Sequence, residues 1–185
     1  APLDFDELGE ERNTDLLLEG TNDKGRFLVA VEAKADEPFG NKYVSAQLAD
    51  ALDKQLTNPR SNEFRRIQQL ACAILGPRRD DDTALKKIRY QLLTATAGAM
   101  CEAARKRIAT AILLIHEFVT DKTDDKKHRV NQRDLDGFIR RVTHGTHRTL
   151  PCGEIVGPIQ LPGQPLFSNE IGFFVLKVSR NLRTT

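Results

Sequence analysis

The order of hydrophobic and polar positions along the chain predicts strands alternating with helices. Near the start, two short apolar runs at residues 15–20 and 26–34 flank a polar turn that contains Gly25. Two such runs around a glycine-containing turn are typical of a β-hairpin. Because side chains alternate along a strand, Glu32 and Lys34 are expected on the same face of the second run.

The middle of the chain predicts three helices. Residues 44–56, 62–75 and 84–106 carry apolar side chains at helical spacing. Gly76-Pro77 is expected to end the second of these helices, because glycine caps a helix and proline cannot continue it. The segment Asp-Asp-Asp-Thr at residues 80–83 is expected to cap the third.

The last third of the chain predicts three more strands and one helix. Residues 108–120 are almost continuously apolar, which is typical of a strand covered on both faces. Residues 121–129 are charged and predict a loop, and residues 131–142 predict a short amphipathic helix. Two closing strands are expected at 154–161 and 171–179. The pattern as a whole predicts an α/β protein with a mixed β-sheet flanked by helices.

Composition places this pattern in an ordinary globular protein. The 185 residues suit a single domain over 1–185, and 39% hydrophobic with 29% charged residues argues against disorder. The net charge of +2 leaves any polyanion binding to local clusters of lysine and arginine. No stretch approaches the roughly 18 apolar residues of a membrane span, so no membrane partner is expected. Three cysteines without Cys-x-x-Cys spacing favour a cytoplasmic location.

The hairpin carries the strongest candidate chemistry. If residue numbers in the two strands pair to an odd sum such as 47, Asp15 lies opposite Glu32, with Cβ atoms about 4.5–5.5 Å apart. Lys34 would then share their face. Two facing carboxylates repel each other, and a hard divalent cation such as Mg²⁺ or Mn²⁺ relieves that repulsion.

This arrangement resembles the PD-(D/E)XK nuclease superfamily, in which an Asp opens one strand and a following apolar strand ends in Glu-x-Lys. Residues 13–17, 31–40, 89–93 and 115–118 resemble more narrowly a bacterial group within it. The resemblance implies a restriction-endonuclease-like core. It also implies an Mg²⁺- or Mn²⁺-dependent endo- or exonuclease whose nucleic-acid partner is DNA rather than RNA.

The resemblance also assigns roles to individual residues. Asp15, Glu32 and Lys34 are the expected catalytic residues, with Asp15, Glu32 and the carbonyl of Ala33 as metal ligands. Additional candidates for the site are Glu19, Gln91 and Glu11. Thr14 stands where many members carry proline, and the upstream glutamate of many members has no firm counterpart.

Two other functions stay open at the level of the sequence. The first is a non-catalytic nucleic-acid-binding or protein-interaction module that keeps the same scaffold, and the second is a hydrolase of small phosphate esters. Symmetric cleavage of a duplex would favour a homodimer, but the sequence alone identifies no interface.

Overall fold

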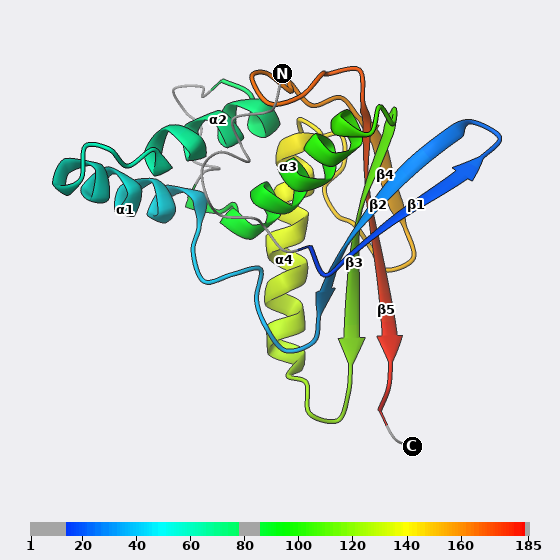
Figure 1. Cartoon of the computed structure of the whole chain (residues 1–185). Helices are drawn as coiled ribbons and strands as arrows, with labels where there is room; N and C mark the ends of the chain where they lie inside the picture. The colour runs from blue at the N-terminus through cyan, green and yellow to red at the C-terminus, as the bar shows by residue number, and fades with distance from the viewer. Residues whose placement is uncertain (1–13, 78–85, 184–185) are drawn as a thin grey trace.

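A computed structural model describes residues 14–77 and 86–183 of the chain, which form an α/β fold (Figure 1). The helices are α1 (Val44–Thr57), α2 (Glu63–Leu75), α3 (Tyr90–Arg105) and α4 (Asp125–Val142). The strands are β1 (Leu16–Asn22), β2 (Gly25–Lys34), β3 (Thr110–Val119), β4 (Ile155–Ile159) and β5 (Gly172–Asn181). Their order along the chain is the predicted one.

The predicted hairpin is confirmed. β1 and β2 pair antiparallel, with Leu16 opposite Val31 and Asn22 opposite Gly25. Gly25 has a φ of 113°, a left-handed conformation that glycine adopts without strain, and this allows the tight turn. In each pair the two residue numbers sum to 47. Continued by one residue beyond Leu16, this register places Asp15 opposite Glu32.

All five strands join one mixed sheet in the order β1-β2-β3-β5-β4. The two outer pairs are antiparallel, whereas β2–β3 and β3–β5 are parallel. Parallel neighbours need long crossover connections, and here α1–α3 and α4 supply them. As a result, the carboxyl ends of β2, β3 and β5 lie at the same edge of the sheet.

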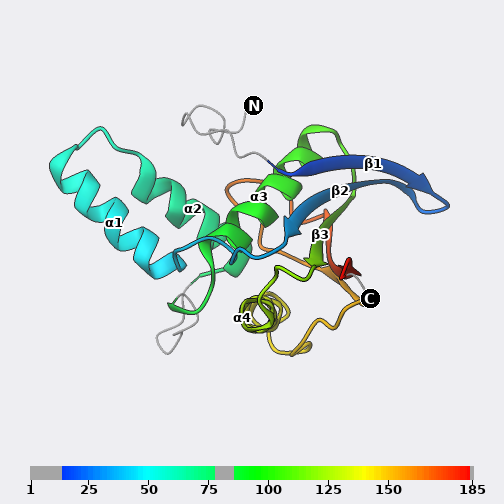
Figure 2. The same cartoon turned by 90° about the horizontal axis from the view of Figure 1, so that it is seen from below.

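The four helices lie on one side of the sheet, as Figures 1 and 2 show. α3 packs directly on β2 and β3, and its alanines at positions 95, 97, 99 and 103 are buried, which allows the close approach. Burial along β3 alternates from Thr110 to Phe118, with Leu113 and Ile115 buried and Leu114 partly exposed. The expectation that this strand is covered on both faces is therefore wrong. β3 is apolar on both sides because its second face, which no described helix covers, also carries uncharged side chains.

Two helix boundaries also differ from the predictions. α3 begins at Tyr90 rather than at residue 84, because Arg89 is extended and bridges to Tyr43. α4 begins at Asp125, inside the segment predicted as a loop. Its N-cap is Asp124, whose side chain accepts a hydrogen bond from the backbone of Lys126.

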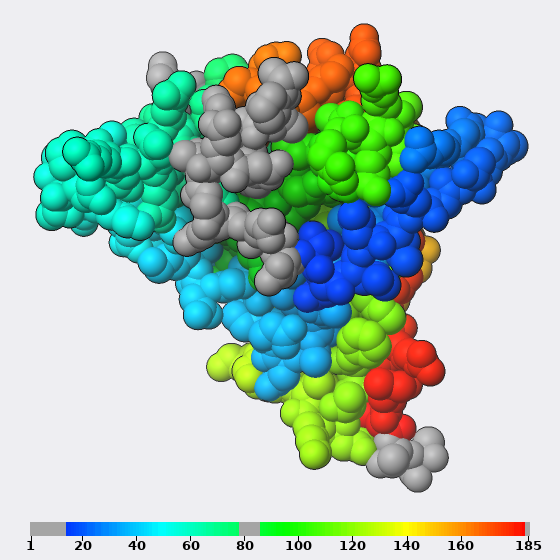
Figure 3. All heavy atoms as spheres, viewed as in Figure 1, coloured from blue at the N-terminus to red at the C-terminus, as the bar shows by residue number. Residues whose placement is uncertain are grey.

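The remaining boundaries agree with the sequence pattern. α2 ends at Gly76, with a φ of 76°, as predicted. The acidic cap expected at 80–83 lies outside the described residues. In Figure 3 the β1–β2 hairpin and the α1–α2 pair protrude from opposite sides of the molecule. Over residues 14–77 and 86–183, no helix has the length and hydropathy needed to cross a membrane.

Candidate functional site

Asp15, Glu32 and Lys34 come together where β2 ends. Asp15 directly precedes β1, and its Oδ2 accepts a hydrogen bond of 2.7 Å from the backbone N–H of Ala33. This bond fixes the exposed Asp15 carboxylate beside the Glu32-Ala33 peptide. The hairpin register thus places the Asp15 side chain next to the backbone of the Glu32-Ala33-Lys34 segment.

Glu32 and Lys34 are buried, each with 4% of its surface exposed. Lys34 Nζ lies 3.3 Å from Glu32 Oε1 and 4.0 Å from Glu37 Oε1. The ammonium group also lies 5.6 Å from the centre of the Phe39 ring. Burying charged groups is costly unless they are paired, so this pair is a specific feature of the fold and not a solvated surface contact.

Gln91 lies at this site as well. It stands in the first turn of α3, and its Nε2 donates a hydrogen bond of 2.6 Å to Glu32 Oε1. The amide therefore fixes the orientation of a buried carboxylate from the helix that packs on the sheet. The backbone of Arg89 is extended and bridges to Tyr43, so the first turn of α3 begins at the next residue.

A second group of buried polar residues follows on the same face of the sheet. Glu117 in β3 is the parallel neighbour of Lys34, and it is 7% exposed. Its carboxylate lies 3.2 Å from Lys177 Nζ of β5 and 2.9 Å from His128 Nδ1 of α4. Lys177 in turn donates to Gln132 Oε1 at 2.6 Å.

Sequence reasoning missed this second group. Glu117 is in phase with the buried Leu113 and Ile115, and Lys177 interrupts an apolar strand. A charge at a buried position of a strand was the available signal. Lys34, Glu117 and Lys177 line the same small cavity together with Asn131, which is 4% exposed. Ionisable groups concentrated in this way are typical of functional sites.

The other candidate residues lie elsewhere. Glu19 is toward the far end of β1, where hydrogen bonds from Lys106 and Arg26 lower its pKa below the usual value. Glu11 lies outside the described residues. His116, in the 115–118 segment that carries part of the resemblance, pairs with Ala33 and lies on the face of the sheet away from Glu32, where its ring contacts Phe118.

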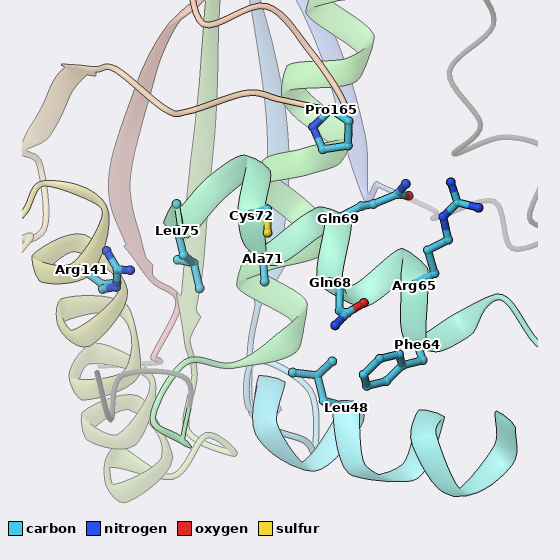
Figure 4. A pocket seen from close by; sticks show the side chains of 11 residues that line it. Leu48, Phe64, Arg65, Gln68, Gln69, Ala71, Cys72, Leu75, Arg141 and Pro165 are labelled. Atoms are coloured by element: carbon cyan, nitrogen blue, oxygen red, sulfur yellow. The ribbon is translucent and has the colours of Figure 1, made fainter. Parts of the chain in front are cut away.

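Two larger pockets are lined by described residues. One, of about 570 Å³, lies along α2 beside Phe64 and Cys72 (Figure 4), and none of its described lining residues is a carboxylate or an imidazole. The other, of about 350 Å³, is open to solvent and is lined by Lys42, Tyr90 and Gln91. Although smaller, the second pocket is the relevant one, because Gln91 connects it directly to Glu32.

The candidate metal donors at this site are oxygen atoms. Among the described residues, no group of three or more His, Cys, Asp or Glu side chains could hold a metal. A closed zinc cage is therefore not formed by these residues. Mg²⁺ keeps several waters and takes one or two carboxylates, and Asp15, Glu32 and the Ala33 carbonyl supply a donor set of that hard, oxygen-only type.

Fold and site together define an α/β protein with buried ionisable residues at one edge of a mixed sheet. The chain belongs to the family described as Domain of unknown function (DUF6946), which matches residues 1–174. No curated protein and no solved structure matches the chain.

Proposed function

We propose that this protein is a Mg²⁺- or Mn²⁺-dependent nuclease that hydrolyses phosphodiester bonds, with DNA as its substrate. The observation that carries the proposal is the anchored Asp15 carboxylate beside the buried Glu32–Lys34 pair. A restriction-endonuclease-like assignment of the core belongs to the same proposal. The predicted order of elements and the mixed sheet support it.

Asp15, Glu32 and the carbonyl of Ala33 would hold the cation. When bound, the cation would neutralise phosphate charge and lower the pKa of a coordinated water. Gln91 keeps Glu32 in one orientation through its 2.6 Å hydrogen bond. Lys34 is close enough to this carboxylate to orient the attacking water and to stabilise the negative charge that develops on the phosphate.

The open pocket beside Gln91 is where the substrate would lie. Lys42, whose ammonium group is paired with the exposed Asp50, and Asn41 supply polar groups there, and Tyr90 contributes an aromatic ring. A cation near a phosphate and a ring that can contact a base are features that nucleic-acid sites use without reading sequence. These groups favour a nucleic-acid strand as substrate.

Cleavage of supercoiled plasmid DNA with Mg²⁺ or Mn²⁺ tests the proposal. The wild-type protein is expected to nick or linearise the plasmid, and EDTA is expected to stop the reaction. Asp15→Ala and Lys34→Ala are expected to abolish cleavage. The matched control is Asp23→Ala, which removes an exposed carboxylate from the turn of the same hairpin. Full cleavage by Asp15→Ala and Lys34→Ala would contradict the proposal.

A second candidate function is a non-catalytic binding module on the same scaffold. It is favoured by the existing partners of Glu32, since Lys34 and Gln91 already neutralise and hold this carboxylate without a metal ion. The two functions differ in metal binding. A calorimetric Mn²⁺ titration that gives binding in wild type and none in Glu32→Ala supports the nuclease, whereas DNA binding without divalent binding supports the module.

A further inference from the structure

One face of the β-sheet is left uncovered by the helices. All four described helices lie on the other side (Figures 1 and 2). We name this second side the open face. It is represented by Leu18 of β1, Val31 of β2, Ile112 and Leu114 of β3, and Phe174 and Leu176 of β5. Register places these residues on one side, because Leu18 lies in phase with Val31, and Leu114 pairs with both Val31 and Leu176.

The open face is apolar across its width. At its two edges, Leu16 and Leu18 of β1 are 50% and 46% exposed, and Ile155 of β4 is 52% exposed. The central residues Ile112 and Leu176 are partly exposed, although strand neighbours surround them, whereas Val31 beside Leu16 is only 6% exposed. Large apolar side chains gathered in this way on an exposed surface mark an interaction site rather than ordinary solvent-facing structure.

Charge is almost absent from the open face. Among the described strand residues that point to this side, Arg180 at the end of β5 is the one permanently charged side chain, and His116 is the one imidazole. By contrast, the charged residues Glu32, Lys34, Glu117 and Lys177 all point to the helical side. A partner for the open face therefore needs an apolar surface and not a charged one.

The extent of the open face suits a dimer. With strands about 4.8 Å apart and a rise of about 3.3 Å per residue, five strands of five to ten residues cover about 600 Å². Two such faces in contact over their full extent bury about 1,200 Å², which is the lower end of the range of specific, stable protein interfaces.

We infer that the open face is the interface of a homodimer, in which the sheets of two copies pack against each other. An uncharged face is compatible with itself, whereas a charged face would repel its own copy. Two twisted sheets pack face to face about 10 Å apart, with apolar side chains from both filling the space. In this arrangement both candidate sites remain on the outer, helical sides of the dimer. The inference does not depend on the proposed nuclease activity.

Sedimentation velocity of the purified chain over a range of concentrations tests this inference. The wild-type protein is expected at twice its chain mass of 20.8 kDa. Leu114→Glu places a charge at the centre of the face, and Leu18→Lys places one at an edge position that is already 46% exposed. Each is expected to raise the dissociation constant by about a hundredfold or more, because an unpaired charge would be buried on association.

The control is Leu56→Lys on α1, a leucine that is 75% exposed and lies outside the open face. It is expected to leave the dimer unchanged. Far-UV circular dichroism checks folding, and if Leu114→Glu does not fold, Leu18→Lys decides the result. A wild-type protein that stays at 20.8 kDa at every concentration overturns the inference. A dimer that survives in both variants also overturns it.

Discussion

Replacing Lys34 by methionine tests whether the buried Glu32–Lys34 pair is an energetically coupled unit. Methionine keeps much of the volume of the lysine stem and removes its charge. The change leaves the Glu32 carboxylate 4% exposed, with the amide of Gln91 still donating to it. A buried carboxylate that loses its cation is a named cause of large destabilisation.

The magnitude follows from the geometry. At the observed 3.3 Å between Lys34 Nζ and Glu32 Oε1, two unit charges attract each other by about 5 kcal/mol at an effective dielectric constant of about 20. Part of this attraction only offsets the loss of hydration. Removing one partner of a buried pair costs about 3–5 kcal/mol, and we expect Lys34→Met to lower the free energy of unfolding by about that amount.

Urea denaturation followed by circular dichroism measures this change in a double-mutant cycle. Glu32→Gln removes the partner charge, and the double variant is expected to recover much of the stability lost in Lys34→Met. The coupling energy between the two positions should therefore reach about 2 kcal/mol or more. The control cycle uses Lys42 and Asp50, an ion pair whose side chains are 51% and 53% exposed, for which a coupling of about 0–1 kcal/mol is expected.

The same coupling energy in both cycles would contradict the expected coupling of Glu32 and Lys34. Equal values would mean that water screens Glu32 and Lys34 as well as it screens the surface pair. The dry environment on which both the stability argument and the proposed chemistry depend would then be absent. Addition of Mg²⁺ to Lys34→Met extends the test, since a cation bound at Glu32 is expected to raise the melting temperature.

Other contacts give further predictions. Asp134→Asn leaves the Arg89 guanidinium, whose Nε lies 2.5 Å from the carboxylate, without its buried counter-ion. The free energy of unfolding should fall by about 3 kcal/mol or more, against about 0–1 kcal/mol for Asp125→Asn at the exposed Asp125–Arg183 pair; equal losses in urea melts would contradict this. Hydrogen bonds from Lys127 and a backbone N–H lower the pKa of Asp36 from its usual 3.8. Its contribution to stability is present above that value and is lost as pH falls through the lowered pKa. Asp36→Asn should therefore show a smaller drop in melting temperature between neutral pH and about pH 3, and an unchanged drop would argue against this role.

Local patterns along the chain were enough to predict the hairpin and the candidate residues in it. An apolar run that ends in Glu32-Ala33-Lys34, a short polar turn and a run that starts at Asp15 determine the register within narrow limits, because the turn allows few pairings. Gly76 likewise ends α2 as predicted. These features depend on interactions between residues close in sequence, and such interactions are visible in the sequence itself.

At the start of α4 the local sequence pattern predicts the wrong structure. Residues 121–129 are so rich in charge that they predicted a loop, yet Asp124 caps a helix that begins at Asp125. The helix persists because α4 packs its buried face, including Leu135 and Phe138, into the core. Tertiary packing overrides a polar sequence when one face of the helix is buried.

Only the tertiary structure decided what surrounds the hairpin. Gln91 reaches Glu32 from α3, and Glu117 and Lys177 meet on neighbouring strands that lie far apart in the chain. The apolar pattern of β3 also led to the wrong prediction that both of its faces are covered, since a strand covered on both faces and a strand with one apolar open face have the same composition. Such contacts depend on strand order and helix placement, which are set by packing of the whole chain and not by neighbouring residues. The sequence by itself thus determined the hairpin and its paired charges, and the fold decided which groups hold them in place and which surface remains uncovered.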